Sequence, residues 1–99
     1  MGLSELRPVP KMYKDAWKTI RAVNHKLRQR MIEVIQAHDQ MTATDVYVRL
    51  RLEQSVASQH LAVLRRAGIV LTERQGKFIY YRIDNERLAV IKRCCKELA

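Results

Sequence analysis

Apolar residues recur at every third or fourth position along most of the chain, which is the spacing of one face of an α-helix. The first run predicts a helix over Met12–Val23. The next predicts a second helix, for which Asn24 has the short polar side chain of an N-cap and which ends near His38. The regular structure therefore begins with two consecutive amphipathic helices.

Two further helices follow, joined by a short turn. Thr42 or Thr44 is the expected N-cap of the first, which stops around Arg51. The second begins at Ser55, and Gly68 is placed to end it in a left-handed conformation. Helical spacing divides its side chains between two faces. The inward set is Ala57, His60, Leu61 and Leu64, and the outward set is Ser58, Gln59, Ala62, Arg65 and Arg66.

The pattern changes after Gly68, where β-branched and aromatic residues replace helical spacing. Ile69–Arg74 and Phe78–Ile83 are predicted as the strands of a β-hairpin, separated by residues 75–77. Asp84 is then the expected N-cap of a last helix. The apolar stripe of that helix is Leu88, Ile91, Cys95 and Leu98.

The predicted order is α-α-α-α-β-β-α, a mainly α fold of the α+β class. A short helix, a turn and a second helix with a polar outer face are typical of a helix-turn-helix, and the following hairpin supplies a wing. Such a face suits the major groove of duplex DNA, because small and hydrogen-bonding side chains reach base edges while cationic ones bind phosphates. The predicted DNA-binding residues are Ser55, Ser58, Gln59, Ala62, Arg65, Arg66, Arg74 and Lys77.

Length and charge narrow the class of protein. Ninety-nine residues make one domain over 12–99, preceded by an irregular leader over 1–11 that contains two prolines. Nineteen Lys and Arg against ten Asp and Glu give a formal charge of +9, which favours a polyanionic partner such as DNA. The sequence shows no nucleophile and base triad, no phosphate-binding glycine loop and no paired carboxylates, so it does not indicate an enzyme.

Neither a membrane span nor an export signal is expected. The longest stretch without Asp, Glu, Lys or Arg runs from Gln54 to Leu64, whereas roughly 20 apolar residues are needed to cross a bilayer. Residues 1–11 lack the apolar core of a signal peptide, so the cytoplasm is the expected location.

Several stretches of the chain carry a resemblance to a known family. Residues 58–70, Ser-Gln-His-Leu-Ala-Val-Leu-Arg-Arg-Ala-Gly-Ile-Val, resemble the recognition helix of ArsR/SmtB-type winged-helix repressors. Residues 25–32 resemble that family's opening of the second helix, with Lys26 in place of a proline. The glycine of the wing and the Tyr-Tyr-Arg-Ile sequence after it are similar to the family as well. The resemblance covers the chain from about Met12 to Leu98.

The resemblance implies a homodimer, joined through the first and last helices, that binds an operator and releases it on sensing a signal. DNA recognition favours the same assembly, because one module reads few base pairs and two half-sites about 34 Å apart require two-fold symmetry. The nature of a small effector is not indicated. The expected dimerisation residues are Met12, Trp17, Ile20, Leu88, Ile91, Cys95 and Leu98.

The resemblance also locates two metal sites of the family, and this sequence has the ligand set of neither. Where family metal sensors carry Cys-x-Cys at the start of the third helix, this chain has Thr42 and Thr44. On the last helix, the family's Asp and His positions meet Asp84, Glu86 and Glu97. Because a transition metal needs several thiolate or imidazole ligands, no metal or other cofactor is expected.

The two cysteines, Cys94 and Cys95, are adjacent, so a disulfide between them would strain the backbone and close almost no loop. Cys95 continues the apolar stripe of the last helix and is expected to pack there as a small hydrophobe. The alternative is a thiol-based redox switch, helped by neighbouring Lys92, Arg93 and Lys96, whose positive charges favour the thiolate.

Another class of function stays open beside DNA binding. A winged helix can serve as a module that binds a protein or an anionic surface, although the polar and cationic outer face of the fourth helix favours DNA. Among other residues, His60 is expected as a hydrogen-bonded packing residue and Arg87 as part of a solvated face. One of Tyr80 and Tyr81 should pack inward, because neighbours in a strand point to opposite faces.

Overall fold

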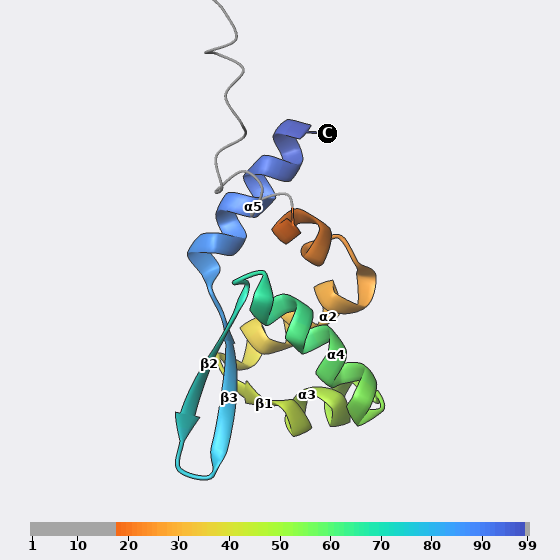
Figure 1. Ribbon diagram of the computed structural model, residues 1–99, viewed down its shortest axis with the longest axis vertical. Helices are drawn as coiled ribbons and strands as arrows, with labels where there is room; N and C mark the ends of the chain where they lie inside the picture. Colours follow the sequence, from red (N-terminus) through yellow and green to blue (C-terminus); the bar gives the residue numbers. More distant parts are fainter. Residues whose placement is uncertain (1–17, 99) are drawn as a thin grey trace, which may run out of the picture.

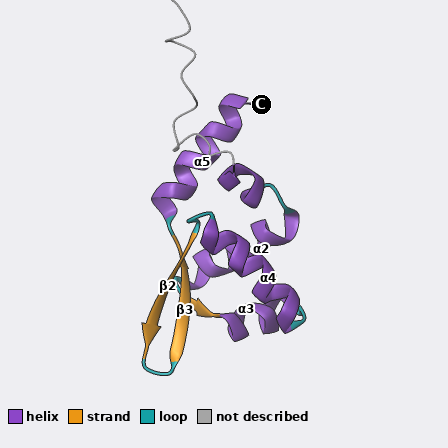
Figure 2. Cartoon of the chain, viewed as in Figure 1, coloured by secondary structure: helices purple, strands orange, loops and turns teal. Residues whose placement is uncertain are grey.

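The computed structural model describes the backbone of residues 18–98 and the side chains of residues 18–93 (Figure 1). The elements are, in chain order, the helical residues 18–23, α2 (Lys26–His38), β1 (Met41–Thr42), α3 (Ala43–Leu50), α4 (Gln54–Arg66), β2 (Val70–Gln75), β3 (Phe78–Ile83) and α5 (Asn85–Leu98). The hairpin projects at one end of the molecule and α5 extends toward the other (Figure 2). Within the described part of the chain, no helix has the length and apolar character that a bilayer span needs.

The sheet has one strand more than the sequence predicted. β1 pairs antiparallel with β3, so that Met41 lies opposite Tyr81 and Thr42 opposite Tyr80. The strand order is β1-β3-β2. The predicted order α-α-α-α-β-β-α is therefore wrong in omitting β1, while its helices and hairpin are confirmed from residue 18 onward. β2 begins and ends one residue later than predicted, and β3 has its predicted bounds.

The helix starts show where capping was predicted correctly. Thr42 caps α3, accepting a hydrogen bond from the Asp45 N–H at 3.1 Å, while the Asp45 carboxylate accepts the Thr42 N–H. The prediction that Asn24 caps α2 is wrong. His25 occupies the N-cap, and its Nδ1 accepts the N–H of Leu27 at 3.2 Å. For α5, the predicted cap is confirmed, since the Asp84 carboxylate accepts the N–H of Arg87.

Helix α4 begins one residue before Ser55 and ends as predicted at a left-handed glycine. Gly68 has a φ of 77°. Its N–H donates to the carbonyl of Arg65 at 3.0 Å, and the N–H of Ile69 donates to the carbonyl of Leu64 at 3.1 Å. This pair of bonds is a Schellman motif, which satisfies carbonyl groups that the helix end would leave unpaired.

The hydrophobic core lies between α2, α3, α4 and the base of the sheet, and α5 closes it. Three of the four predicted inward residues of α4 are buried, with Ala57, Leu61 and Leu64 at most 2% exposed, while His60 is only half-buried. From α5, Leu88 and Ile91 are 3% and 2% exposed within the single chain. Their burial therefore stabilises one protomer and requires no second subunit. Ile20 packs against the same core, whereas Met12 and Trp17 and the side chains of Cys94, Cys95 and Leu98 lie outside the described part.

Arg87 corrects the prediction of a solvated face on the last helix. The side chain is half-buried, and its Nε donates to the carbonyl of Ala67 at 2.9 Å. Its Nη2 donates to Thr19 Oγ1 at 3.2 Å, and this hydroxyl donates to the same carbonyl at 3.1 Å. The prediction was wrong because the C-terminal end of α4 offers a partly buried acceptor to this guanidinium. These bonds tie α4 to α5 and to the first helix.

Substituting alanine for Gly68 is expected to destabilise the fold more than the same change at Gly76. Both residues have positive φ, which costs a side chain about 1–2 kcal/mol. A Cβ at Gly68 would also lie 2.8 Å from Arg87 Nε, whereas a Cβ at Gly76 meets nothing within 4 Å. Urea unfolding of Gly68→Ala and Gly76→Ala at one protein concentration measures the difference. Equal losses of stability would count against the Arg87 contact.

Candidate nucleic-acid interface

The turn between α3 and α4 fixes how α4 is presented. Arg51 ends α3 in the left-handed region, with a φ of 55°, and the N–H of Leu52 donates to the carbonyl of Tyr47 at 2.8 Å. This tight turn is the one predicted for a helix-turn-helix. The two helices meet at an angle (Figure 1), and burial of Ala57, Leu61 and Leu64 turns the other face of α4 away from the core.

The outer face of α4 is exposed along its whole length, as predicted. Short polar or small side chains occupy the first turns, and two guanidinium groups occupy the last. Such a surface admits a base edge and holds its cations where phosphates flank a groove. The exposed residues are Ser55, Ser58, Gln59, Ala62, Arg65 and Arg66.

A hollow of about 390 Å³ separates α4 from the wing. Its lining is Ser58, Leu61, Ala62, Arg65, Arg66 and Tyr81. Tyr81 is half-buried and packs against the core, so it is the inward-facing member of the tyrosine pair. The sequence predicted that one of Tyr80 and Tyr81 packs inward while the other could approach a phosphate, without deciding which. The period-2 pattern of β3 was the available signal, but only the folded sheet brings this tyrosine beside the arginines of α4.

The wing carries its predicted cations at the tip. Gln75 pairs with Phe78, leaving a two-residue turn in which Gly76 supplies the positive φ. Arg74 and Lys77 are both exposed. Because Arg74 lies opposite Ile79, two residues along from Tyr81, it shares the face of the hairpin that carries Tyr81. The structure therefore brings Arg74 to the same side of the wing as the hollow.

A second polar cluster, which we call the histidine–arginine junction, consists of His25, Arg28 and His60. Arg28 Nη1 lies 3.3 Å from Nδ1 of His60, and the two imidazole centroids are 4.9 Å apart. Burial lowers the pKa of His60, and the nearby His25 and Arg28 lower it further. His60 is thus the hydrogen-bonded packing residue predicted, but its partner, on α2, was not foreseen.

Two of the positions that carry metal ligands in the resembling family have capping roles here. Thr42 uses its hydroxyl to cap α3, and Asp84 uses its carboxylate to cap α5. Thr44 and Glu86 are exposed, and Glu97 lies beyond the described side chains. Among the residues whose side chains are described, no group of three or more His, Cys, Asp or Glu is placed to hold a metal ion.

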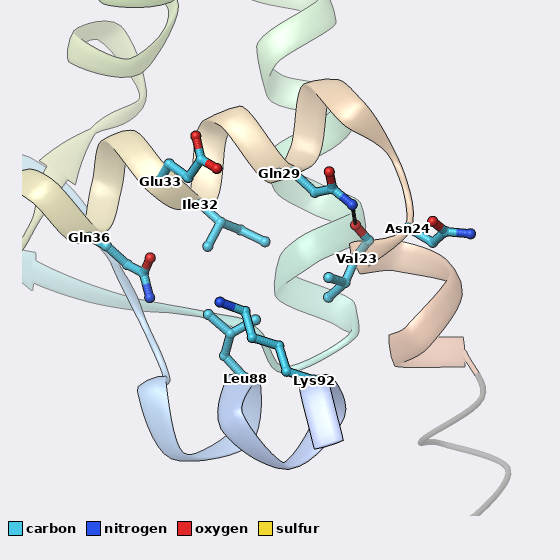
Figure 3. A pocket seen from close by; sticks show the side chains of 8 residues that line it. All are labelled: Val23, Asn24, Gln29, Ile32, Glu33, Gln36, Leu88 and Lys92. Atoms are coloured by element: carbon cyan, nitrogen blue, oxygen red, sulfur yellow. Dashed lines mark hydrogen bonds between the residues drawn. The ribbon is translucent and has the colours of Figure 1, made fainter. Parts of the chain in front are cut away.

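Another pocket, also of about 390 Å³, lies between α2, α5 and the end of the first helix (Figure 3). Its apolar part is formed by Val23, Ile32 and Leu88, and Lys92 extends over Leu88 toward the middle. Asn24 and the amide and carboxylate groups of α2 complete the lining, which contains no residue of α4. The size is in the range of small-molecule pockets, and the lining suits an organic molecule better than a metal ion.

Comparisons with known proteins agree with this arrangement. The family model described as bacterial regulatory protein, arsR family, matches residues 26–72. The chain is similar to the transcriptional repressor PagR of Bacillus anthracis, with 30% identity over 74 residues, covering 75% of this chain and 74% of that protein. It is also similar to the uncharacterized HTH-type transcriptional regulator YbzH of Bacillus subtilis (strain 168), with 48% identity over 40 residues. That match spans only 40% of each of the two chains.

The crystal structure of the transcriptional repressor PagR has the same fold. Its TM-score with this chain is 0.72 at 28% identity, and the match covers 84% of this chain and 95% of that one. The shared architecture is a winged helix, in which helices pack against a small three-stranded antiparallel sheet.

Proposed function

The chain belongs to the ArsR family of bacterial regulatory proteins, and from this premise we propose that it is a sequence-specific, DNA-binding transcriptional repressor. The observation that carries the proposal is the division of α4, whose inner face is buried while its outer face exposes hydrogen-bonding and cationic side chains. The exposed guanidinium groups of α4 and the cations of the wing add a phosphate-binding surface around that face. The family consists of transcriptional regulators rather than enzymes.

Two substitutions separate base recognition from phosphate binding. Gln59→Ala should relax base preference within each half-site at a cost of about 1–3 kcal/mol, because a glutamine amide pairs with an adenine edge through two bonds. Lys77→Ala should weaken all sequences nearly equally, since an ammonium on the wing tip contacts phosphate. Competition assays with single-base operator variants measure both profiles. An unchanged preference profile for Gln59→Ala would remove this residue from base recognition.

We propose a homodimer joined through the first and last helices. Leu88 and Ile91 lie beneath the proposed dimer interface rather than in it, because both are buried within one protomer. The outer face of α5 keeps an exposed apolar residue, Val90, at 47% exposure. A single exposed valine is ordinary on a monomer, so the support for a second subunit comes from operator recognition, because two half-sites require two-fold symmetry. Two-fold symmetry would then place two copies of α4 in successive major grooves.

Metal sensing through the family positions does not fit this chain. The Thr42 hydroxyl and the Asp84 carboxylate already serve as helix caps, and the hydroxyls and carboxylates at these positions lack the softness that selects zinc or similar ions. We therefore propose a repressor whose signal, if it has one, is not a metal bound at those positions. A thiol-based response through Cys94 and Cys95 remains the rival hypothesis, because these are the only cysteines of the sequence.

A further inference from the structure

The contact between Arg28 and His60 fixes the protonation state of the histidine. A guanidinium group has N–H donors and no acceptor, so Nδ1 of His60 must accept at 3.3 Å and cannot carry a proton. His60 is therefore neutral in this structure, with its proton on Nε2. The low pKa of His60 agrees with that state.

His25 is held in the same way. Its Nδ1 accepts the backbone N–H of Leu27 as the cap of α2, so this ring also needs an unprotonated Nδ1. His38 is the opposite case. Its Nδ1 lies 2.8 Å from the carbonyl of Val34, which can only accept, so the bond survives when the ring is doubly protonated. Two of the three histidines thus lose a hydrogen bond on protonation, and the third does not.

Arg28 connects these rings to the rest of the fold. Its Nε donates to the carbonyl of Ala22 at 2.6 Å, and its Nη2 lies 3.5 Å from the carbonyl of Arg21. The side chain therefore holds the end of the first helix, the start of α2 and the middle of α4 together, and α2 and α4 lie side by side (Figure 1). The groups that act electrostatically on His60 are His25 and Arg28.

His60 follows Gln59 in sequence. It lies on the side of α4 opposite the surface that is proposed to face DNA. We propose that Arg28 is a positioning residue for DNA binding, which acts through His60 and does so only while His25 and His60 are neutral. This inference rests on the proposed function, since it concerns how the same α4 surface is held. Protonating His60 breaks its bond to Arg28 and sets two cations beside each other, and protonating His25 breaks its bond to the N–H of Leu27 at the start of α2. Either change loosens the contact between α2 and α4.

The direction of the pH effect follows from the pKa of His60. Because its folded-state pKa is lowered, the unfolded chain binds more protons as the pH falls below the ordinary histidine value. The stabilising effect of the junction is therefore complete above about pH 6.5 and is lost as the pH falls from there through the folded-state pKa. Added positive charge alone would strengthen DNA binding in acid. Weaker specific binding in acid is thus the distinguishing sign.

The test compares operator affinity at pH 7.5 and pH 5.5 in four proteins at constant ionic strength. The parent should bind roughly tenfold more weakly at pH 5.5 than at pH 7.5, a factor typical of coupling between two sites. The double variant His25→Asn with His60→Gln should lose most of this dependence, because both new side chains accept a hydrogen bond without titrating. His38→Gln is the matched control and should behave as the parent. Arg28→Met should bind more weakly at pH 7.5 and lose most of the pH dependence.

Two further measurements make the outcomes distinct. Histidine ring signals followed by NMR should give His60 a pKa below the ordinary value, and urea unfolding should show the parent still folded at pH 5.5. An identical pH profile in the double variant and the parent would overturn the inference, as would a loss of affinity that merely follows unfolding. If no duplex is bound at pH 7.5 but the His60 titration is low, the proposed function fails while the junction itself stands.

Discussion

Raising the salt concentration from 50 to 200 mM is expected to weaken operator binding by roughly 10³- to 10⁵-fold. Each protomer exposes four cations at the proposed interface, and a dimer doubles that number. About six to ten phosphate contacts of this kind release enough counterions to give such a loss of affinity. The salt slope is the change in the logarithm of the binding constant with the logarithm of the salt concentration. The four cations are Arg65, Arg66, Arg74 and Lys77.

The salt slope of suitable variants also shows which residues make the phosphate contacts. Arg66→Gln removes one cation from each protomer and should reduce the slope by about two in a dimeric complex. Arg93→Gln makes the same charge change on an exposed residue of α5 and should leave the slope close to that of the parent. Fluorescence anisotropy titrations at four salt concentrations measure both. A slope near zero in the parent, or equal reductions in the two variants, would count against a phosphate-binding surface on α4.

Leu64→Ala is expected to lower the free energy of unfolding by about 2–5 kcal/mol. Leu64 is fully buried, and it lies on the inner face of the same helix that carries Gln59 and Arg65. A cavity there removes packing that holds α4 against the core. Since a small domain has a total stability of about 5–15 kcal/mol, operator binding should fail at moderate temperature as well.

Val48→Ala is the matched control for this cavity. Val48 is 64% exposed on α3, so truncating its side chain should change stability by no more than about 0.5 kcal/mol. Urea unfolding of both variants at one protein concentration makes the comparison, because the apparent stability of a dimer depends on concentration. Similar losses for Leu64→Ala and Val48→Ala would contradict the placement of α4 in the core.

Periodicity predicted those parts of the fold that local chemistry determines. The division of α4 into a buried and an exposed face was confirmed, and so were the left-handed ending at Gly68 and the cap at Asp84. In each case the residue type satisfies backbone groups close to it in sequence. The exposed set of α4, which we propose faces DNA, followed from the same periodicity, because all its members lie on one side of a single helix.

Contacts between distant segments could not be predicted in this way. β1 has two residues and forms because β3, far along the chain, offers it a pairing edge. Arginine is a residue type usually found at the surface. Arg87 and Arg28 nevertheless donate hydrogen bonds to backbone carbonyls of other segments of the chain. The cap of α2 was assigned to Asn24 on general preference, whereas the adjacent His25 has the ring nitrogen in reach of Leu27. The strand pairing and the two arginine contacts depend on tertiary placement, whereas this cap is local and was missed because histidine is not among the usual N-cap residues.

The central claim is that the outer face of α4 recognises a specific duplex. Its most direct test is a competition titration at 150 mM salt between a duplex selected by this protein from a random library and a scrambled duplex of equal length and composition. The account predicts that two protomers bind the selected duplex, and that they bind it at least about 10³-fold more tightly than the scrambled one. Equal affinity for the two duplexes, or equal affinity for vesicles of anionic lipid, would contradict it.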